Sequence, residues 1–548
     1  MVIALQRIIY RCRQIAGRNL LVPVLLVLIC IVPIWFILSQ YVNTPSSELV
    51  QIFQDYQVLT LMKNTFVLLI MVSGLSFVLG VSIAWIIAMY EFPLRKFVSV
   101  AFMFPLAFPA YVFAFIYTGL FDSSGLIQAL YKLTFNKFVW FDGFRTPFGV
   151  AFILSLSLYP YVYIIVKNAF ETQGSRIFEI SKIHGINKRF LIFKLILPMA
   201  SPWIAGSMLL VSMETMADFG AVSILGYETF TTAIYKAWYG FFKFEHALLL
   251  SGILVILALV LLVAEKLYSK RKEFYSVERV DKPFKKKKLL GLELYGILFY
   301  LFLILFFSFI LPLIQLLLWC FSAFSVEFST DYINYIKNTL LLSFAGVFIV
   351  LFFGYFLAYY YRNHKSIISL VIVMIATAGY AIPGSVLAVG FYTPVTKFFY
   401  NILDMLNFMK FSQLLTTFAG LFILIFGYTV RYVSVGYNTL YGNLSRIKSG
   451  IFEQARLLDV PSSDVFKKVI FPSLKGSFFS AAIMSFLDIA KEMPITLMTR
   501  PAGWDTLAVR IFGLTAEGEW ERAAIPSLIL VALGILPILV MITKSRSH

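Results

Sequence analysis

Long uninterrupted apolar stretches constrain this chain more than any other feature of its sequence. Stretches such as Leu20 to Leu38 and Leu248 to Ala264 hold about 20 residues, the length that a helix needs to cross the hydrocarbon of a bilayer. Hydrophobic residues make up 60% of the 548 residues and charged residues 14%, so a soluble fold could not bury the apolar surface. Because backbone groups in lipid must be hydrogen-bonded internally and these stretches lack two-residue alternation, the sequence predicts an all-α, polytopic membrane protein.

Apolar stretches of sufficient length place about twelve membrane-spanning helices. They are predicted at 20–40, 64–88, 98–120, 147–167, 199–225, 247–265, 293–321, 338–361, 367–391, 414–436, 473–499 and 524–543. Basic residues precede the first span without an acidic one, and an even number of spans returns the chain to the same side. The positive-inside rule therefore predicts that both termini are cytoplasmic, together with the loop from Arg431 to Phe471.

A displacement of 274 residues superposes the two halves of the sequence. Lys63-Asn64-Thr65 recurs as Lys337-Asn338-Thr339, and Pro109 recurs as Pro383. We therefore predict two parallel six-helix repeats in the same orientation, with a transport pathway at their interface. The predicted division is a first permease repeat at 1–265, a basic cytoplasmic linker at 266–292 and a second repeat at 293–548.

One spaced motif occurs in a predicted cytoplasmic loop of each half. Its positions are Glu179, Ser181, Gly185 and Pro198 in the first half, and Glu453, Ala455, Asp459 and Pro472 in the second. Each segment predicts a short helix, a break and an amphipathic stretch that ends at a proline opening the next span. The gap from Gly185 or Asp459 to the proline is 13 residues in both halves.

This motif resembles the EAA loop of permease subunits in binding-protein-dependent ABC importers. The resemblance implies the type I ABC importer permease fold, and it implies that the eight motif residues couple the chain to ATPase subunits. Asp459 departs from the usual glycine, but aspartate tolerates turn conformations. The chain has no G-x-x-x-x-G-K-[ST] phosphate loop, so it is expected to be a transport subunit and not an enzyme. ATP and Mg²⁺ would be bound by two ATP-binding cassette subunits.

Acidic residues interrupt the predicted fifth span of each half at equivalent positions. The pathway candidates are Glu214 and Asp218 in the first half, and Asp488 and Glu492 in the second. A charge within hydrocarbon costs at least about 2.5 kcal/mol, so these carboxylates should face water or partners instead of lipid. An alternative is that they form structural ion pairs with Lys491 or with basic groups on neighbouring helices.

The segment from Met213 to Gly220, the segment from Phe230 to Trp238, and Lys491 to Pro494 resemble the ferric iron importer permeases. The resemblance implies Fe³⁺ as the transported substrate, delivered by a periplasmic or lipid-anchored ferric-binding protein at a bacterial inner membrane. Hard carboxylate oxygens suit a hard trication, but no metal site is firmly assigned and no cofactor is expected on this chain.

Several other functions fit parts of the same sequence pattern. Thiamine, polyamine, sulfate and phosphonate permeases share the EAA loop, and the acidic fifth spans favour a cation. A proton-coupled secondary transporter can also have parallel repeats and intramembrane acids, although the duplicated EAA loop argues against it. The net charge of +18 is explained by basic cytoplasmic loops, so no nucleic-acid partner is expected. No catalytic motif such as H-E-x-x-H is present.

Overall fold

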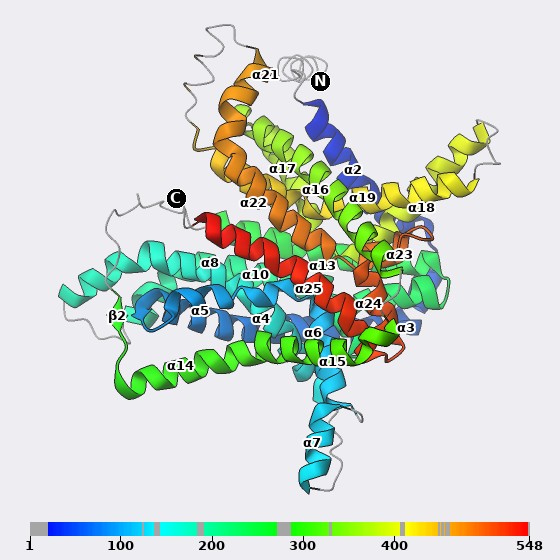
Figure 1. Cartoon of the computed structure of the whole chain (residues 1–548). Helices are drawn as coiled ribbons and strands as arrows, with labels where there is room; N and C mark the ends of the chain where they lie inside the picture. Colours follow the sequence, from blue (N-terminus) through cyan, green and yellow to red (C-terminus); the bar gives the residue numbers. More distant parts are fainter. Residues whose placement is uncertain are drawn as a thin grey trace. The chain divides into compact units, whose positions relative to one another are not determined.

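The computed structural model describes most of the chain as helices joined by short connections (Figure 1). The described residues are 20–122, 125–135, 143–183, 191–270, 286–327, 331–405, 412–447, 450, 454 and 461–545. Among them, ten helices are long and apolar enough to cross a membrane, or up to twelve if two bent helix pairs each count as one span. The predicted all-α, polytopic fold class is confirmed.

The helices group into two compact units. The first comprises Met1–Pro45, Ala237–Val255 and Thr330–Val509, and the second comprises Ser46–Lys236, Ile256–Ser329 and Arg510–His548. Helix α2 (Leu21–Asn43), the first that the structure describes, therefore belongs to the unit built mainly from the second half of the sequence. The repeat boundaries inferred from the sequence remain a prediction, because the compact units divide the chain differently.

In the first unit, α2 packs on α16, α17 and α18, and α16 packs on α19 and α22 (Figure 1). The Cys30 thiol of α2 lies 3.8 Å from the Ala376 carbonyl oxygen of α17. The elements are α2 (Leu21–Asn43), α16 (Asp331–Asn363), α17 (Ile367–Ala378), η6 (Gly379–Ala381), α18 (Gly384–Met405), α19 (Ser412–Leu444), α21 (Ser462–Val465), η8 (Phe466–Ile470), α22 (Phe471–Ala490) and α23 (Pro494–Thr499). Three further elements reach both units or their boundary: η4 (Lys236–Gly240), α13 (Phe244–Lys270) and α24 (Leu507–Ala516).

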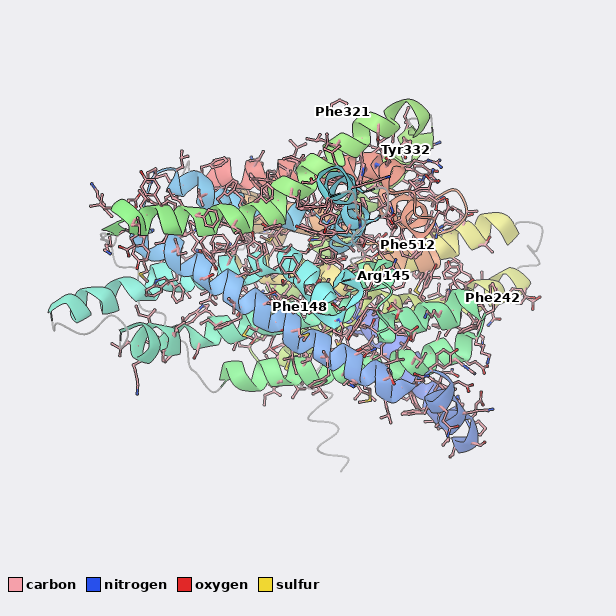
Figure 2. All side chains as sticks on the ribbon, turned by 90° about the horizontal axis from the view of Figure 1, so that it is seen from below. Arg145, Phe148, Phe242, Phe321, Tyr332 and Phe512 are labelled. Atoms are coloured by element: carbon pink, nitrogen blue, oxygen red, sulfur yellow. The ribbon has the colours of Figure 1, made fainter. Side chains whose placement is uncertain are left out.

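In the second unit, α4 packs on α8 and α10, and α15 packs on α25. The elements are α3 (Ser46–Asp55), α4 (Val58–Met89), β1 (Tyr90–Glu91), α5 (Arg95–Ala101), η1 (Phe104–Ala107), α6 (Ala110–Phe121), α7 (Leu126–Phe135), η2 (Gly143–Arg145), α8 (Pro147–Ile183), η3 (Leu191–Ile196), α10 (Leu197–Ala217), α11 (Gly220–Ile224), α12 (Phe230–Tyr235), β2 (Lys287–Lys288), α14 (Gly291–Leu305), η5 (Phe306–Ile310), α15 (Leu311–Glu327) and α25 (Trp520–Ser545). Figure 2 shows the side chains, among them Phe321 on α15, which is 83% exposed as a lipid-facing residue would be.

Prolines at equivalent positions break one span in each repeat. Pro109 separates the pair formed by α5 and η1 from α6, and Pro383 separates α17 and η6 from α18. The two pairs are bent by 89° and 111°, so the predicted spans 98–120 and 367–391 are broken helices. Proline removes a backbone donor and disfavours helix at the preceding residue, which explains a break at this position in both halves.

The end of the central linker is paired with the first half of the chain. Strands β1 and β2 are parallel, with Tyr90 opposite Lys287 and Glu91 opposite Lys288. The Lys286 ammonium group donates to the Ile87 carbonyl oxygen at 3.2 Å and to the Glu171 carboxylate at 3.4 Å. The described end of the linker is therefore fixed to the end of α4 and to Glu171 within α8.

Candidate functional site

The helix of the fifth span ends earlier than predicted in both repeats, at the acidic motif. Helix α10 stops at Ala217 and the short helix α11 begins at Gly220, whereas the span was predicted to continue to residue 225. Helix α22 stops at Ala490 and α23 begins at Pro494, inside the predicted span 473–499. The broken backbone exposes the amide groups that begin each short helix, and these need acceptors.

Asp218 supplies this acceptor in the first repeat. One of its carboxylate oxygens accepts hydrogen bonds from the backbone amides of Ala221 and Val222, both at 3.1 Å. The Asp218 carbonyl oxygen also accepts a hydrogen bond from the Thr231 hydroxyl at 2.7 Å. The side chain therefore holds the start of α11 and the approach to α12 in place.

Glu492, the equivalent of Asp218 in the second repeat, makes the same contacts at the start of α23. Its carboxylate accepts from the backbone amides of Ile495 at 3.0 Å and Thr496 at 3.3 Å, and from the Thr496 hydroxyl at 3.3 Å. Glu492 is only 5% exposed. A carboxylate buried to this extent needs hydrogen-bond donors and an opposite charge around it to offset the loss of hydration.

The opposite charge is Arg431, which lies in α19 and is 8% exposed. It is close enough to Glu492 for a direct electrostatic attraction. Both side chains lie against Gly384 at the start of α18: a Cβ atom there would come within 2.6 Å of the Glu492 Oε1 atom and 2.7 Å of the Arg431 Nη1 atom. Only glycine leaves room for this pair beside the backbone of α18.

The other two acidic residues lie one helical turn earlier, and both are half-buried. Asp488 forms an ion pair with Lys491, with 3.1 Å between the carboxylate oxygen and the ammonium nitrogen. This is one of the ion pairs that the sequence left open as an alternative. Glu214 occupies the equivalent position on α10.

Arg431 was misplaced by sequence reasoning, which put the start of a cytoplasmic loop at this residue. In the structure α19 continues through it to Leu444, and its side chain is buried. The positive-inside rule counts basic residues near span ends and cannot distinguish a loop arginine from one that pairs with an acid inside the bundle. The sequence signal that points to Arg431 is Glu492, because an acidic residue inside an apolar span needs a basic partner on a neighbouring helix.

The coupling motif is described only in part. Glu179 and Ser181 lie on α8, which runs without interruption from Pro147 to Ile183, so the separate short helix predicted there is wrong. Pro198 and Pro472 occupy the first turns of α10 and α22, as predicted, and each follows a π-helical turn, η3 or η8. Gly185, Glu453, Ala455 and Asp459 lie outside the described residues. The coupling role of all eight residues remains a prediction.

Among the described residues, no three histidine, cysteine, aspartate or glutamate side chains are grouped so that they could hold a metal ion. The acidic motif therefore caps a short helix in both repeats, and in the second repeat it also contains one ion pair and one buried charge pair.

Comparison with known proteins agrees with this architecture. Residues 76–265 match the family described as the binding-protein-dependent transport system inner membrane component. The helical fold, the broken spans and this match define the chain as a multi-pass inner-membrane permease of the binding-protein-dependent ABC importers. Permeases of this class function with a substrate-binding protein and with ATPase subunits.

The relatives point to several substrates. The chain is 24% identical to the Fe(3+)-transport system permease protein FbpB 2 of Haemophilus influenzae over 88% of its own length and 89% of that protein. It is 23% identical to the sulfate transport system permease protein CysT of Escherichia coli over 38% of its own length and 75% of that protein. It is 33% identical to the putative 2-aminoethylphosphonate transport system permease protein PhnV of Salmonella typhimurium over 21% of its own length and 41% of that protein.

Proposed function

We propose that this chain is the permease through which ferric iron enters the cytoplasm from a periplasmic or lipid-anchored binding protein. The observation that carries the proposal is similarity over nearly the whole chain to an Fe(3+)-transport permease, because the sulfate and phosphonate permeases match less than half of it. ATP hydrolysis on two separate ATP-binding cassette subunits drives transport, and both termini of the chain are cytoplasmic.

The four acidic residues divide into two roles in this proposal. Asp218 and Glu492 cap the short helices and fix the break in each fifth span. Glu214 and Asp488 are half-buried one turn away and provide hard oxygen ligands for transient contact with the iron. Weak contacts suit this purpose, because an ion that is bound too tightly would not leave.

Movement of the coupling loops connects ATP hydrolysis to this pathway. Pro198 and Pro472 begin α10 and α22, the helices that carry the acidic residues. A displacement of either loop by an ATPase subunit is therefore transmitted along one continuous helix to the break. Alternating access follows when the two repeats rock about the pathway.

The second candidate is an importer of an oxyanion such as sulfate or a phosphonate, which the shorter matches favour. Intramembrane carboxylates would repel such a substrate. Another organic cation, such as thiamine or a polyamine, fits the acidic residues but is named by none of the relatives compared above.

Uptake into vesicles distinguishes these functions. Vesicles that contain this chain, its ATPase and its binding protein are supplied with labelled ferric iron, in the presence of excess sulfate, phosphonate, thiamine or a polyamine. ATP-dependent iron uptake that no competitor reduces supports the proposal. Transport of a competitor in place of iron overturns the substrate but retains the permease, and ATP-independent transport overturns both. The Glu214→Gln, Asp488→Asn double variant should lose iron uptake but still assemble with the ATPase subunits.

A further inference from the structure

A pocket of about 770 Å³ lies among α18, α19 and the turn that follows α23. All of these elements belong to the first compact unit. The volume falls within the range of small-molecule sites. The pocket lies away from the buried Glu492 pair, at the end of these helices that the charge pattern predicts to face outside.

The charged groups that line the pocket are both basic. Lys397 projects from α18, and Arg500 follows the last residue of α23. No aspartate or glutamate belongs to the described lining. Hydroxyl and amide groups complete the polar surface, among them Thr396, Thr499 and Asn401. The Thr396 and Thr499 hydroxyls donate to backbone carbonyl oxygens of their own helices, so the donors available to a ligand come mainly from the two basic side chains. Two cations without an acid in the lining favour an oxyanion over a cation or an uncharged ligand.

Arg500 is held in position by its own neighbours. Its Nε atom donates to the Asp505 carboxylate, and its Nη1 atom donates to the Leu497 carbonyl oxygen at 2.7 Å. Arg500 also contacts the Tyr239 hydroxyl, which itself donates to the Leu497 carbonyl oxygen. A guanidinium group carries five N–H donors, so these contacts leave others for a ligand. Asp505 offsets part of the Arg500 charge. Lys397 is exposed and forms no ion pair with an acid in the described part of the chain, so its full charge is available to the pocket.

Taken together, the equivalent positions in the first repeat have a net charge of the opposite sign. A displacement of 274 residues replaces Lys397 by Ser123 and Arg500 by Gly226. Across the positions that line the pocket, the second repeat has two basic residues and no acid, whereas the first has three acids and one base. The residues of the first repeat are Asp122, Asp142, Glu228 and Arg145. The basic pocket is therefore a property of the second repeat alone.

The rest of the lining is apolar and aromatic. Phe399, Ile423 and Pro501 contribute to it, and Phe398 and Phe418, which are 61% and 55% exposed, lie beside it in sequence. Exposed aromatic residues near a span end are typical of the lipid interface. The pocket is also much larger than a single phosphate ion requires.

We propose that this pocket binds a phosphate-bearing anion, with Lys397 and Arg500 contacting the phosphate group. The anion comes either from the headgroup of an anionic phospholipid, whose chains would lie on the apolar lining, or from a soluble phosphate. The proposal goes beyond iron transport and does not depend on it, because binding is measured without iron, ATP or partner subunits.

Two arms of one experiment distinguish the sources. In the first arm, the full chain is reconstituted in nanodiscs that contain phosphatidylglycerol, extracted gently, and analysed by native mass spectrometry for retained lipid. In the second arm, binding of radiolabelled inorganic phosphate is measured in nanodiscs of phosphatidylcholine alone. Both arms use the unaltered chain, Lys397→Gln, Arg500→Gln and the control Lys337→Gln, an exposed lysine outside the pocket.

A charged hydrogen bond removed from the phosphate should weaken binding by about tenfold or more. Retention of phosphatidylglycerol that is lost in Lys397→Gln and kept in Lys337→Gln supports a lipid source. Binding of inorganic phosphate that is lost in Lys397→Gln and kept in Lys337→Gln supports a soluble source. If neither ligand depends on Lys397, the proposal is wrong. This conclusion holds even if Arg500→Gln fails to fold, because the exposed Lys397 can be replaced without disturbing the core.

Discussion

The buried pair of Glu492 and Arg431 allows a quantitative test of how the second repeat is held together. Replacing Glu492 by glutamine removes the negative charge and leaves Arg431, which is 8% exposed, without its counter-charge. Breaking a buried ion pair from one side costs about 3–5 kcal/mol of the free energy of unfolding. The glutamine oxygen can still accept a hydrogen bond from the Ile495 amide. We therefore expect a cost near the lower end, about 3 kcal/mol.

Arg431→Met should have a similar cost, because it leaves the Glu492 carboxylate buried with hydrogen bonds but no cation. The double variant removes both charges and keeps a side chain of similar volume on α19. Replacing a buried pair by neutral residues is often nearly neutral, so the double variant should be much more stable than the two single costs would give if they were additive. The expected coupling energy is about 2–3 kcal/mol.

Unfolding of the purified chain in mixed micelles, with an increasing fraction of sodium dodecyl sulfate and detected by tryptophan fluorescence, gives the four free energies. Asp218→Asn is the comparison in the first repeat, where Ser157 occupies the position equivalent to Arg431 and the Asp218 carboxylate caps α11. This control should cost about 1 kcal/mol, the typical value of one helix cap. If the costs of the two single variants add up to the cost of the double variant to within about 0.5 kcal/mol, Glu492 and Arg431 do not interact and the pairing is refuted.

Three further changes test other parts of the structure. Gly384→Ala should destabilise the chain by about 1–3 kcal/mol in the same unfolding assay, because its Cβ atom would meet Glu492, whereas Gly442→Ala in open space on α19 should not destabilise it. Asn338→Ala should cost about 1–3 kcal/mol in that assay, because the backbone oxygens of residues 503 and 505 lose their donor. Glu179→Ala and Glu453→Ala should insert normally but lose the stimulation of ATPase activity by the binding protein; unchanged stimulation in both would exclude the coupling assignment.

The repeat was the part of the fold that the sequence predicted best, because its polar residues have the same function twice. The Asn64 side chain donates to the Glu228 carbonyl oxygen at 3.0 Å, and Asn338 donates to the Gly503 and Asp505 carbonyl oxygens at 3.1 Å. In each case an asparagine at the start of a long span fixes the loop after the fifth one. Such side chains are constrained by a specific backbone, so they survive in the sequence at a constant offset.

A close helix crossing also recurs, although its residues differ. A Cβ atom on Gly80 of α4 would lie 2.6 Å from the Val162 side chain of α8. At the equivalent crossing of α16 and α19, a Cβ atom on Gly354 would lie 3.0 Å from the Gly436 backbone. Small residues allow helices in a membrane to approach closely, but hydropathy alone does not say which glycines face a neighbour. The crossing was therefore not predictable before the helices were placed.

Helix interruptions were the least predictable feature, since hydropathy reports burial in lipid and not backbone geometry. The apolar pattern continues through Pro109, Asp218 and Glu492, yet each lies at a break. A charged or imino residue inside an apolar run is the only local signal of such a break. Each short helix begins with free backbone amides, and the acid in each motif accepts hydrogen bonds from them. The acidic motif is thus partly explained by backbone hydrogen bonding before any substrate is considered.

The two repeats nevertheless differ in their charged residues. The second repeat has Arg431 where the first has Ser157, and its pocket residues Lys397 and Arg500 replace Ser123 and Gly226. The permease family match covers residues 76–265, within the first repeat only. The two repeats therefore share their helix breaks but differ in their buried charges and in the charges at the pocket positions. Transport by this chain should therefore be asymmetric: neutralising the charges specific to the second repeat should have effects that no equivalent change in the first repeat reproduces.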